Sequence, residues 1–447
     1  MKIKSLLLIS VLMAAIIPVM SQTDSLKSAT KADKIKKGWN FGGLPVIAYN
    51  SDIGFQYGAL VNVFHYGDGS RYPKYNHSLY FEWSRTTKGS GINQFTYDSE
   101  HLIPGIRVSA EASLLTEQSL DFYGFNGYES YYNPDFEDEE NDKYLSRMYY
   151  NMDRQLTRLK ADVQGKITGQ QFRWFAGIEY NKAKMGTVDI DKLNKGKDLE
   201  DQLPDTALLF DNYVDWGIIA EDQADGGHTT LIKAGLVYDT RDIEPNPMKG
   251  IWTDLQFLLA PGFLGNGDMA YTRIALTHRQ YFTLVPQVLS FAYRLSYQAK
   301  LSGKMPYYML PFVYNTAPAL TRDGLGGAKT LRGVLRNRIT GDDFVYGNLE
   351  MRWKFLRTHL GKQNIYLALS AFLDGGMVTS PYKLPDTTNP EALAYFAQGS
   401  KEKLHLGAGA GFHFVMNQNF VIAMDYGRAL DPGDGESGLY IGLNFLY

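Results

Sequence analysis

The stretch from Lys329 to Phe355, KTLRGVLRNRITGDDFVYGNLEMRWKF, decides the fold class. Up to Gly341 it is rich in Gly and Arg and has no sustained apolar period, which indicates a loop. From Val345 onward, apolar and polar side chains alternate with a period of two, which predicts a strand. One face is apolar and aromatic: Val345, Gly347, Leu349, Met351, Trp353 and Phe355. The other face is polar: Tyr346, Asn348, Glu350, Arg352 and Lys354.

Such a strand fits two environments. In a soluble sandwich the polar face meets water, whereas in a membrane barrel it lines the lumen and the apolar face meets lipid. The composition favours the barrel, because the chain has 31 Tyr, 44 Gly and 14% aromatic residues, a profile typical of outer-membrane barrels. A large secreted all-β protein is the alternative. The formal net charge of -3 gives no electrostatic basis for binding nucleic acid.

The N-terminal segment has the three parts of a secretory signal peptide. Lys2 and Lys4 precede an apolar run from Leu6 to Val19, and the small residue Ser21 follows. We therefore expect a signal peptide over 1–21, with cleavage after Ser21. A retained membrane anchor is the alternative, but the run is shorter than the roughly 20 residues that a spanning helix needs. The chain has no Cys, which excludes lipoprotein processing, disulfides and thiolate metal sites.

Alternating segments recur along the rest of the chain and predict an all-β, transmembrane antiparallel β-barrel over 40–447. A polar lead over 22–39 precedes it. The number of segments is about sixteen, and bacterial single-chain barrels have an even number of strands. The predicted strands are 40–49, 52–65, 77–87, 91–103, 105–116, 148–166, 170–184, 228–240, 250–260, 270–284, 287–301, 343–357, 363–374, 402–416, 419–428 and 437–447.

The connections between these strands alternate in length. If the N-terminus is periplasmic, the short turns all fall on the periplasmic side, as bacterial barrels require: Thr168-Gly169, Val285-Pro286 and Asn417-Gln418. The long connections then all fall outside: 117–147, 185–227, 302–342 and 375–401. An error of one strand in the assignment would destroy this regularity.

Leu331-Arg332-Gly333-Val334 resembles the Val-Arg-Gly-Phe/Tyr signature of the BamA/TamA superfamily, the bacterial surface antigen family. In that family a long outer loop folds into the lumen, and its Arg pairs with acids on the two following strands. Here Glu350 lies on the polar face of the next strand. Phe372-Leu373-Asp374-Gly375-Gly376 is similar to the family's Phe-x-Asp-x-Gly motif. The resemblance therefore implies a lumenal cluster that anchors the loop: Arg332, Gly333, Glu350, Asp374 and Gly376.

The resemblance covers the last half of the chain well and the first half only by the number of strands. The turn from Asp239 to Gly250 looks like the family's Asp-Thr-Arg-Asp…Asn-Pro…Gly turn, and Asp425-Tyr426-Gly427 resembles its penultimate strand. Val334 departs from the family, which favours an aromatic residue there. Family insertases also carry periplasmic recruiting domains before the barrel. The lead over 22–39 is too short for one, so we expect a barrel without this arm.

The last strand carries two expectations. Tyr440, Gly442, Phe445 and Tyr447 resemble the C-terminal targeting signal of outer-membrane barrels, which makes this chain a client of the barrel assembly machinery. The first and last strands also contain residues that weaken pairing, because Gly can kink a strand and Pro has no N–H donor. We expect a weak seam between these strands, unless the residues simply mark strand ends: Gly42, Gly43, Pro45, Gly438 and Gly442.

Three classes of function follow. The motifs favour a barrel in the outer membrane of a Gram-negative bacterium that assists protein insertion or translocation through the seam, together with a periplasmic or lipoprotein companion. The alternative is a passive pore or structural barrel whose lumen a loop plugs. We do not expect an enzyme, since no Ser-His pairing suggests an acyl hydrolase. We expect no cofactor, no metal and no nucleic acid, and contact with outer-membrane lipid.

Overall fold

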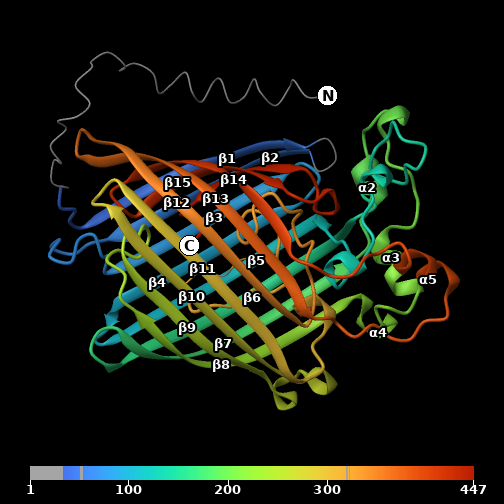
Figure 1. Ribbon diagram of the computed structural model, residues 1–447, viewed down its shortest axis with the longest axis horizontal. Helices are drawn as coiled ribbons and strands as arrows, with labels where there is room; N and C mark the ends of the chain where they lie inside the picture. Colours follow the sequence, from blue (N-terminus) through green and yellow to red (C-terminus); the bar gives the residue numbers. More distant parts are fainter. Residues whose placement is uncertain (1–33, 51–53, 319–320, 322) are drawn as a thin grey trace. The chain divides into compact units, whose positions relative to one another are not determined.

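In the part of the chain that the structure describes, sixteen antiparallel strands follow one another in a single sheet, each paired with its neighbours in sequence order (Figure 1). The computed structural model describes residues 34–50, 54–318, 321 and 323–447. The predicted signal peptide, 1–21, and most of the predicted lead, 22–39, lie outside the described residues. The strands are β1 Trp39–Asn50, β2 Gly54–His65, β3 His77–Thr86, β4 Gly91–Ile103, β5 Ile106–Asp121, β6 Asn151–Thr168, β7 Phe172–Gly186, β8 Gly226–Asp239, β9 Gly250–Ala260, β10 Tyr271–Val285, β11 Leu289–Gly303, β12 Asp343–Leu360, β13 Gln363–Ser380, β14 His405–Met416, β15 Phe420–Ala429 and β16 Ser437–Leu443.

The helices are short and lie in the connections. The α-helices are α2 Ile190–Asn194, α3 Leu209–Asp215, α4 Glu221–Ala224 and α5 Pro390–Phe396. The 3-10 helices are η1 Gly127–Glu129, η2 Pro134–Phe136, η3 Leu199–Asp201, η4 Gly262–Leu264, η5 Gly267–Met269, η6 Tyr307–Met309 and η7 Pro432–Asp434. Within the described ranges, no helix is long and apolar enough to cross a lipid bilayer.

The burial pattern of the strands is the reverse of that of a soluble protein. Large apolar side chains lie on the outside of β11 and β12, where Leu295 is 53% and Trp353 is 49% exposed. Charged side chains on the opposite face of the same strands are buried, among them Arg294, Glu350 and Arg352. Apolar side chains that face outward and polar ones that face inward are typical of a transmembrane β-barrel. The fold is therefore the predicted all-β, transmembrane antiparallel barrel.

The connections alternate between the two edges of the sheet, as predicted. One edge carries the long ones, 122–150, 187–225, 304–342 and 381–404, and the other carries short turns such as 169–171, 286–288 and 417–419. In bacterial outer-membrane barrels the long loops are outside and the short turns are periplasmic, so we call these the outer and the periplasmic edge. Two connections at the periplasmic edge, 66–76 and 240–249, are longer than the turns.

The prediction that the last strand reaches Tyr447 is wrong. β16 ends at Leu443, because Asn444 adopts a left-handed conformation with φ of 68°, which Asn tolerates better than most residues. Residues 444–447 then turn away from the strand. The rings of Phe445 and Tyr447 are buried, and the Phe445 ring stacks on lumenal His413 with 4.4 Å between centroids. Side-chain contacts of residues 444–447 with the lumen wall thus take the place of further strand pairing.

Aromatic side chains from several outer connections pack into one cluster at the outer edge. Tyr213 on α3 contacts Phe122 and Phe125 of connection 122–150, with ring centroids 5.3 Å and 5.5 Å apart. Tyr395 on α5 contacts Trp216 at 5.3 Å. Connection 304–342 adds Tyr307 and Phe312 to the same cluster. Four outer connections are therefore held together by apolar packing, and we call this cluster the outer cap.

Candidate functional site

Arg332 lies in connection 304–342 and its side chain is fully buried in the lumen. Its Nε and Nη2 atoms donate to the two oxygens of Asp374 on β13, at 2.9 Å and 3.1 Å. Its Nη1 atom donates to Glu350 Oε2 on β12 at 2.9 Å. The backbone N–H of Arg332 also donates to Asp374, at 3.0 Å. A fork of donors that meets carboxylates on two strands fixes both the position and the direction of the loop.

A third carboxylate completes this cluster. Asp425 on β15 accepts from Arg332 Nη1 at 3.3 Å, and the guanidinium lies 3.5 Å from the centroid of the Phe372 ring. Glu350 is shared with a second cation, because Arg352 Nε donates to its other oxygen at 2.6 Å. The cluster therefore joins the loop to β12, β13 and β15, and each charge has partners of opposite sign, as buried charges require.

Glycines make room for the loop against the wall. A Cβ atom on Gly427 would lie 2.7 Å from the Arg332 carbonyl carbon, and one on Gly407 would lie 2.1 Å from its carbonyl oxygen. Gly333 has φ of 98°, a conformation that favours Gly, and its Cβ would meet the backbone of Arg428. A Cβ on Gly376 would lie 2.9 Å from Tyr346 Cβ. The loop backbone therefore rests directly on the backbone of β14 and β15.

The sequence pattern singled out Arg332, Gly333, Glu350, Asp374 and Gly376 but not Asp425, Gly407 or Gly427. A signal for these three was present. Asp425 and Gly427 have the lumenal parity of β15, and Gly407 begins a run of alternate glycines on the lumenal face of β14. A surface of glycines beside an unpartnered acid marks a place where another backbone approaches closely.

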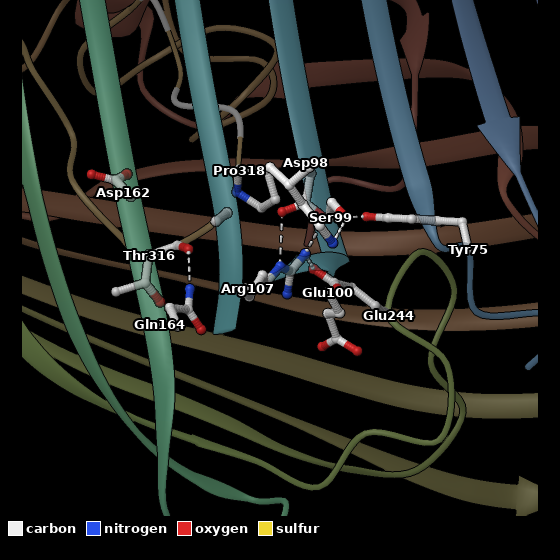
Figure 2. A network of polar contacts seen from close by, with 12 residues as sticks. Tyr75, Asp98, Ser99, Glu100, Arg107, Asp162, Gln164, Glu244, Thr316 and Pro318 are labelled. Carbon is white, nitrogen blue, oxygen red and sulfur yellow. Dashed lines mark hydrogen bonds and ion pairs between the residues drawn. The ribbon is translucent and has the colours of Figure 1, made fainter. Parts of the chain in front are cut away.

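Connection 304–342 also follows the lumen wall before it reaches Arg332. Gln298 Nε2 donates to the Tyr314 carbonyl at 3.2 Å, and Gln164 Nε2 donates to the Thr316 carbonyl at 3.2 Å. The Thr316 N–H donates to Asp254 Oδ2 at 2.6 Å. Figure 2 shows Thr316 beside Gln164 on β6, with Pro318 farther along the same connection near Asp98. The loop is thus bonded to opposite parts of the wall, and it fills the lumen between them.

The seam between β1 and β16 is packed but not paired. In the part of the chain that the structure describes, no backbone ladder joins these two strands. Instead an apolar cluster spans the seam, with Leu60, Phe420 and Leu443 at its centre and Leu44 and Val46 of β1 against it. A Cβ atom on Gly42 would lie 2.6 Å from the Phe420 ring. β1 therefore contacts β15 directly, on the periplasmic side of the point where β16 ends.

The other predicted seam and targeting residues occupy different settings. Gly43 and Pro45 lie on the exposed face of β1, and Pro is found in sheets mainly on edge strands. Gly438 and Gly442 lie in β16, where a Cβ on Gly442 would meet nothing closer than 3.7 Å. The Tyr440 hydroxyl accepts from the Gly333 N–H at 3.0 Å.

Phe445 and Tyr447, the two aromatic residues of the predicted targeting signal, lie in the lumen and not toward lipid. Arg352 lies 4.4 Å from the Phe445 ring centroid and 5.2 Å from that of Tyr447. The Arg352 guanidinium also donates to the Tyr447 carbonyl at 2.9 Å. Arg352 thus links the tail 444–447 to Glu350 and, through it, to Arg332.

These features define an outer-membrane β-barrel whose lumen holds a folded-back loop anchored by a buried arginine. The sequence from 105 to 445 matches the Omp85 superfamily domain. The chain belongs to the Omp85 superfamily, which agrees with the resemblance of its loop and strand motifs. No curated protein matches it in sequence.

Two of the solved structures that this chain matches illustrate its fold. BamA from Haemophilus ducreyi lacking POTRA domains 1-3 is 14% identical, with a TM-score of 0.50, and the match covers 91% of this chain and 69% of that one. CdiB from Escherichia coli is 12% identical, with a TM-score of 0.51, and the match covers 91% of this chain and 62% of that one. This chain thus spans about two thirds of each of these two structures.

Proposed function

We propose that this protein assists the insertion or translocation of proteins at the outer membrane, and that clients engage it at the seam between β1 and β16. The observation that carries the proposal is the absence of a ladder between these strands within the described residues. An unpaired strand edge presents N–H and C=O groups that another strand can pair with. The seam is held by side-chain packing, and its opening would break no backbone ladder.

The loop inside the lumen supports the proposal that clients engage the protein at the seam and not through the lumen. Connection 304–342 crosses the lumen with hydrogen bonds to β6, β9 and β11. A polypeptide that threaded the lumen would have to displace this whole loop and the Arg332 cluster. A structural barrel with a plugged lumen accounts for the same contacts, so the experiment must separate these two functions.

A cross-link between the seam strands tests the proposal. The chain has no Cys, so Leu44→Cys and Gly442→Cys give unique thiols on β1 and β16, and a cleavable bismaleimide can join them. We expect the cross-linked protein to lose client insertion in reconstituted vesicles and to recover it when the linker is cut. A matched control joins Leu276→Cys to Tyr297→Cys, which are partners in the β10–β11 ladder. Equal insertion in all states would favour the structural barrel.

We also propose a separate periplasmic or lipoprotein companion that delivers clients to the barrel. The residues from Ile35 onward form one compact unit, the barrel itself, and a client must reach its seam from the periplasm. Co-purification from native membranes in mild detergent should recover the companion in constant ratio to the barrel. Recovery of the barrel alone under several mild detergents would contradict this part of the proposal.

A further inference from the structure

Connection 66–76 leaves β2 at the periplasmic edge and bonds to one turn and one strand on the far side of the seam. Asn419, in the turn between β14 and β15, donates through Nδ2 to the Tyr66 hydroxyl at 2.6 Å and to the Pro73 carbonyl at 2.7 Å. Asn364, at the start of β13, donates to the Tyr72 hydroxyl at 3.1 Å. The side chains of Tyr66 and Asn419 are buried, with 1% and 2% exposed. The contact between Asn419 and Tyr66 is therefore an interior one, and the contacts with Pro73 and Tyr72 are partly buried.

The same connection is fixed on its own side of the seam. The Tyr75 hydroxyl donates to Asp98 Oδ2 at 2.8 Å, and Arg71 forms an ion pair with Glu100 at 2.8 Å. Arg107 donates to both oxygens of Asp98 through Nε and Nη2, at 2.8 Å each. Figure 2 shows Tyr75, Asp98 and Arg107 converging at this edge. Residues 66–76 are thus bonded to β4 through Arg71 and Tyr75, and to β13 and the β14–β15 turn through other residues of the connection.

The second long periplasmic connection joins this network. Arg107 also donates to Glu244 of connection 240–249 at 3.0 Å, and Asn246 Nδ2 donates to Gln418 Oε1 at 2.8 Å. Two connections from distant parts of the wall therefore meet beside Arg107, and both reach the turn 417–419. Polar contacts of that turn tie the last strands of the barrel to the first ones.

We propose that connection 66–76 is a strap that holds the seam shut at its periplasmic end. Among the residues that the structure describes, no ladder joins β1 and β16, and the periplasmic part of the seam is where β16 has already ended. For the seam to widen there, the β14–β15 turn must move away from β2, and this movement breaks the bonds of Asn419 to Tyr66 and Pro73. The strap thus sets the equilibrium between the closed and the open seam.

The strap rests on the proposed function in one respect only, which is that the seam between β1 and β16 opens. The test therefore measures opening directly. Spin labels at Leu44→Cys and Gly442→Cys report the distance across the seam in vesicles. Asn419→Leu removes both bonds to the strap, and Tyr66→Phe with Tyr72→Phe removes the two hydroxyl contacts while keeping the rings. We expect the population at longer distance to rise about fivefold for each hydrogen bond lost.

Asn93→Leu is the matched control, since Asn93 donates to the Leu114 carbonyl at 3.1 Å at an exposed position on β4. It should leave the distance distribution unchanged. If Asn419→Leu does not fold, the two Tyr→Phe changes decide the outcome. A distribution identical to that of the parent protein would overturn the strap. A widened seam with unchanged client insertion would keep the strap and contradict the proposed function.

Discussion

Arg332 shows how much one buried cation can organise in this lumen. It meets Glu350, Asp374 and Asp425 on three strands. The first two acids could be predicted, because they lie on the lumenal parity of strands that directly follow the loop. Asp425 could not be predicted in the same way, since its contact depends on how far the sheet curves before β15 faces the loop. Strand periodicity fixes a face but not this curvature.

Arg332→Ala should release connection 304–342 from the wall. It leaves three carboxylates facing one another, and the loss of one partner from a buried charge network costs about 3 kcal/mol or more. We expect faster cleavage of the loop by an added protease on intact cells. Arg332→Lys should restore protection only in part, because an ammonium group cannot reproduce the planar fork. Arg357→Ala, which removes an exposed contact with Gln287, is the control and should cleave like the parent protein.

Gly427→Ala should have a similar effect without any change of charge. The added methyl group would overlap the Arg332 backbone at 2.7 Å, and overpacking of this kind costs typically 1–3 kcal/mol. Gly442→Ala, also a lumenal glycine of the last strands, has free space beside it and should behave like the parent protein. The temperature at which each variant shifts from its folded to its unfolded mobility on a gel would measure their stabilities. Equal stability of the two variants would contradict the close approach of the loop to β15.

At the scale of elements, connection 122–150 should be sensitive to pH. Burial, together with the nearby Asp121 carboxylate, raises the pKa of Glu137 from its ordinary 4.5 to about 8. The folded loop thus favours the protonated acid, so the contribution of Glu137 to the stability of the loop is greatest below pH 4.5 and is lost as the pH rises through about 8. We expect proteolysis of this loop to be faster at pH 9 than at pH 5. Glu137→Gln should weaken that dependence, whereas substitution of the exposed Glu140 should not.

The strands themselves were predictable because alternation is a local property. In β11, Arg294 and Ser296 face inward between outward Leu295 and Tyr297, as the sequence alone indicates. The end of β16 was not predictable. Residues 444–447 alternate like a strand, yet in the structure they turn into the lumen and contact Arg352 and His413. The outer cap was also beyond prediction, since its aromatic residues come from connections with no period. Contacts between distant segments decide both of these.

At the scale of the whole molecule, the barrel should not conduct ions freely. The outer cap closes one edge, connection 304–342 fills the lumen, and connections 66–76 and 240–249 meet at the periplasmic edge. We expect no steady current from the purified protein in planar bilayers. Replacement of 312–340 by a short Gly-Ser linker should produce one, because it removes the hydrogen bonds to the wall and the Arg332 cluster. A stable open-channel current from the unmodified protein would contradict this arrangement.

The buried position of Tyr447 has a consequence for the order of folding. Its hydroxyl lies 3.1 Å from the Ala292 carbonyl and 3.3 Å from the Asn348 carbonyl, which are 155 and 99 residues earlier in the chain. Contacts between such distant residues form slowly, and these need β11 and β12 already in place. The ring can therefore reach its site only after most of the wall exists. An environment-sensitive label near Tyr447 would report the last step of maturation, later than any signal from the strands.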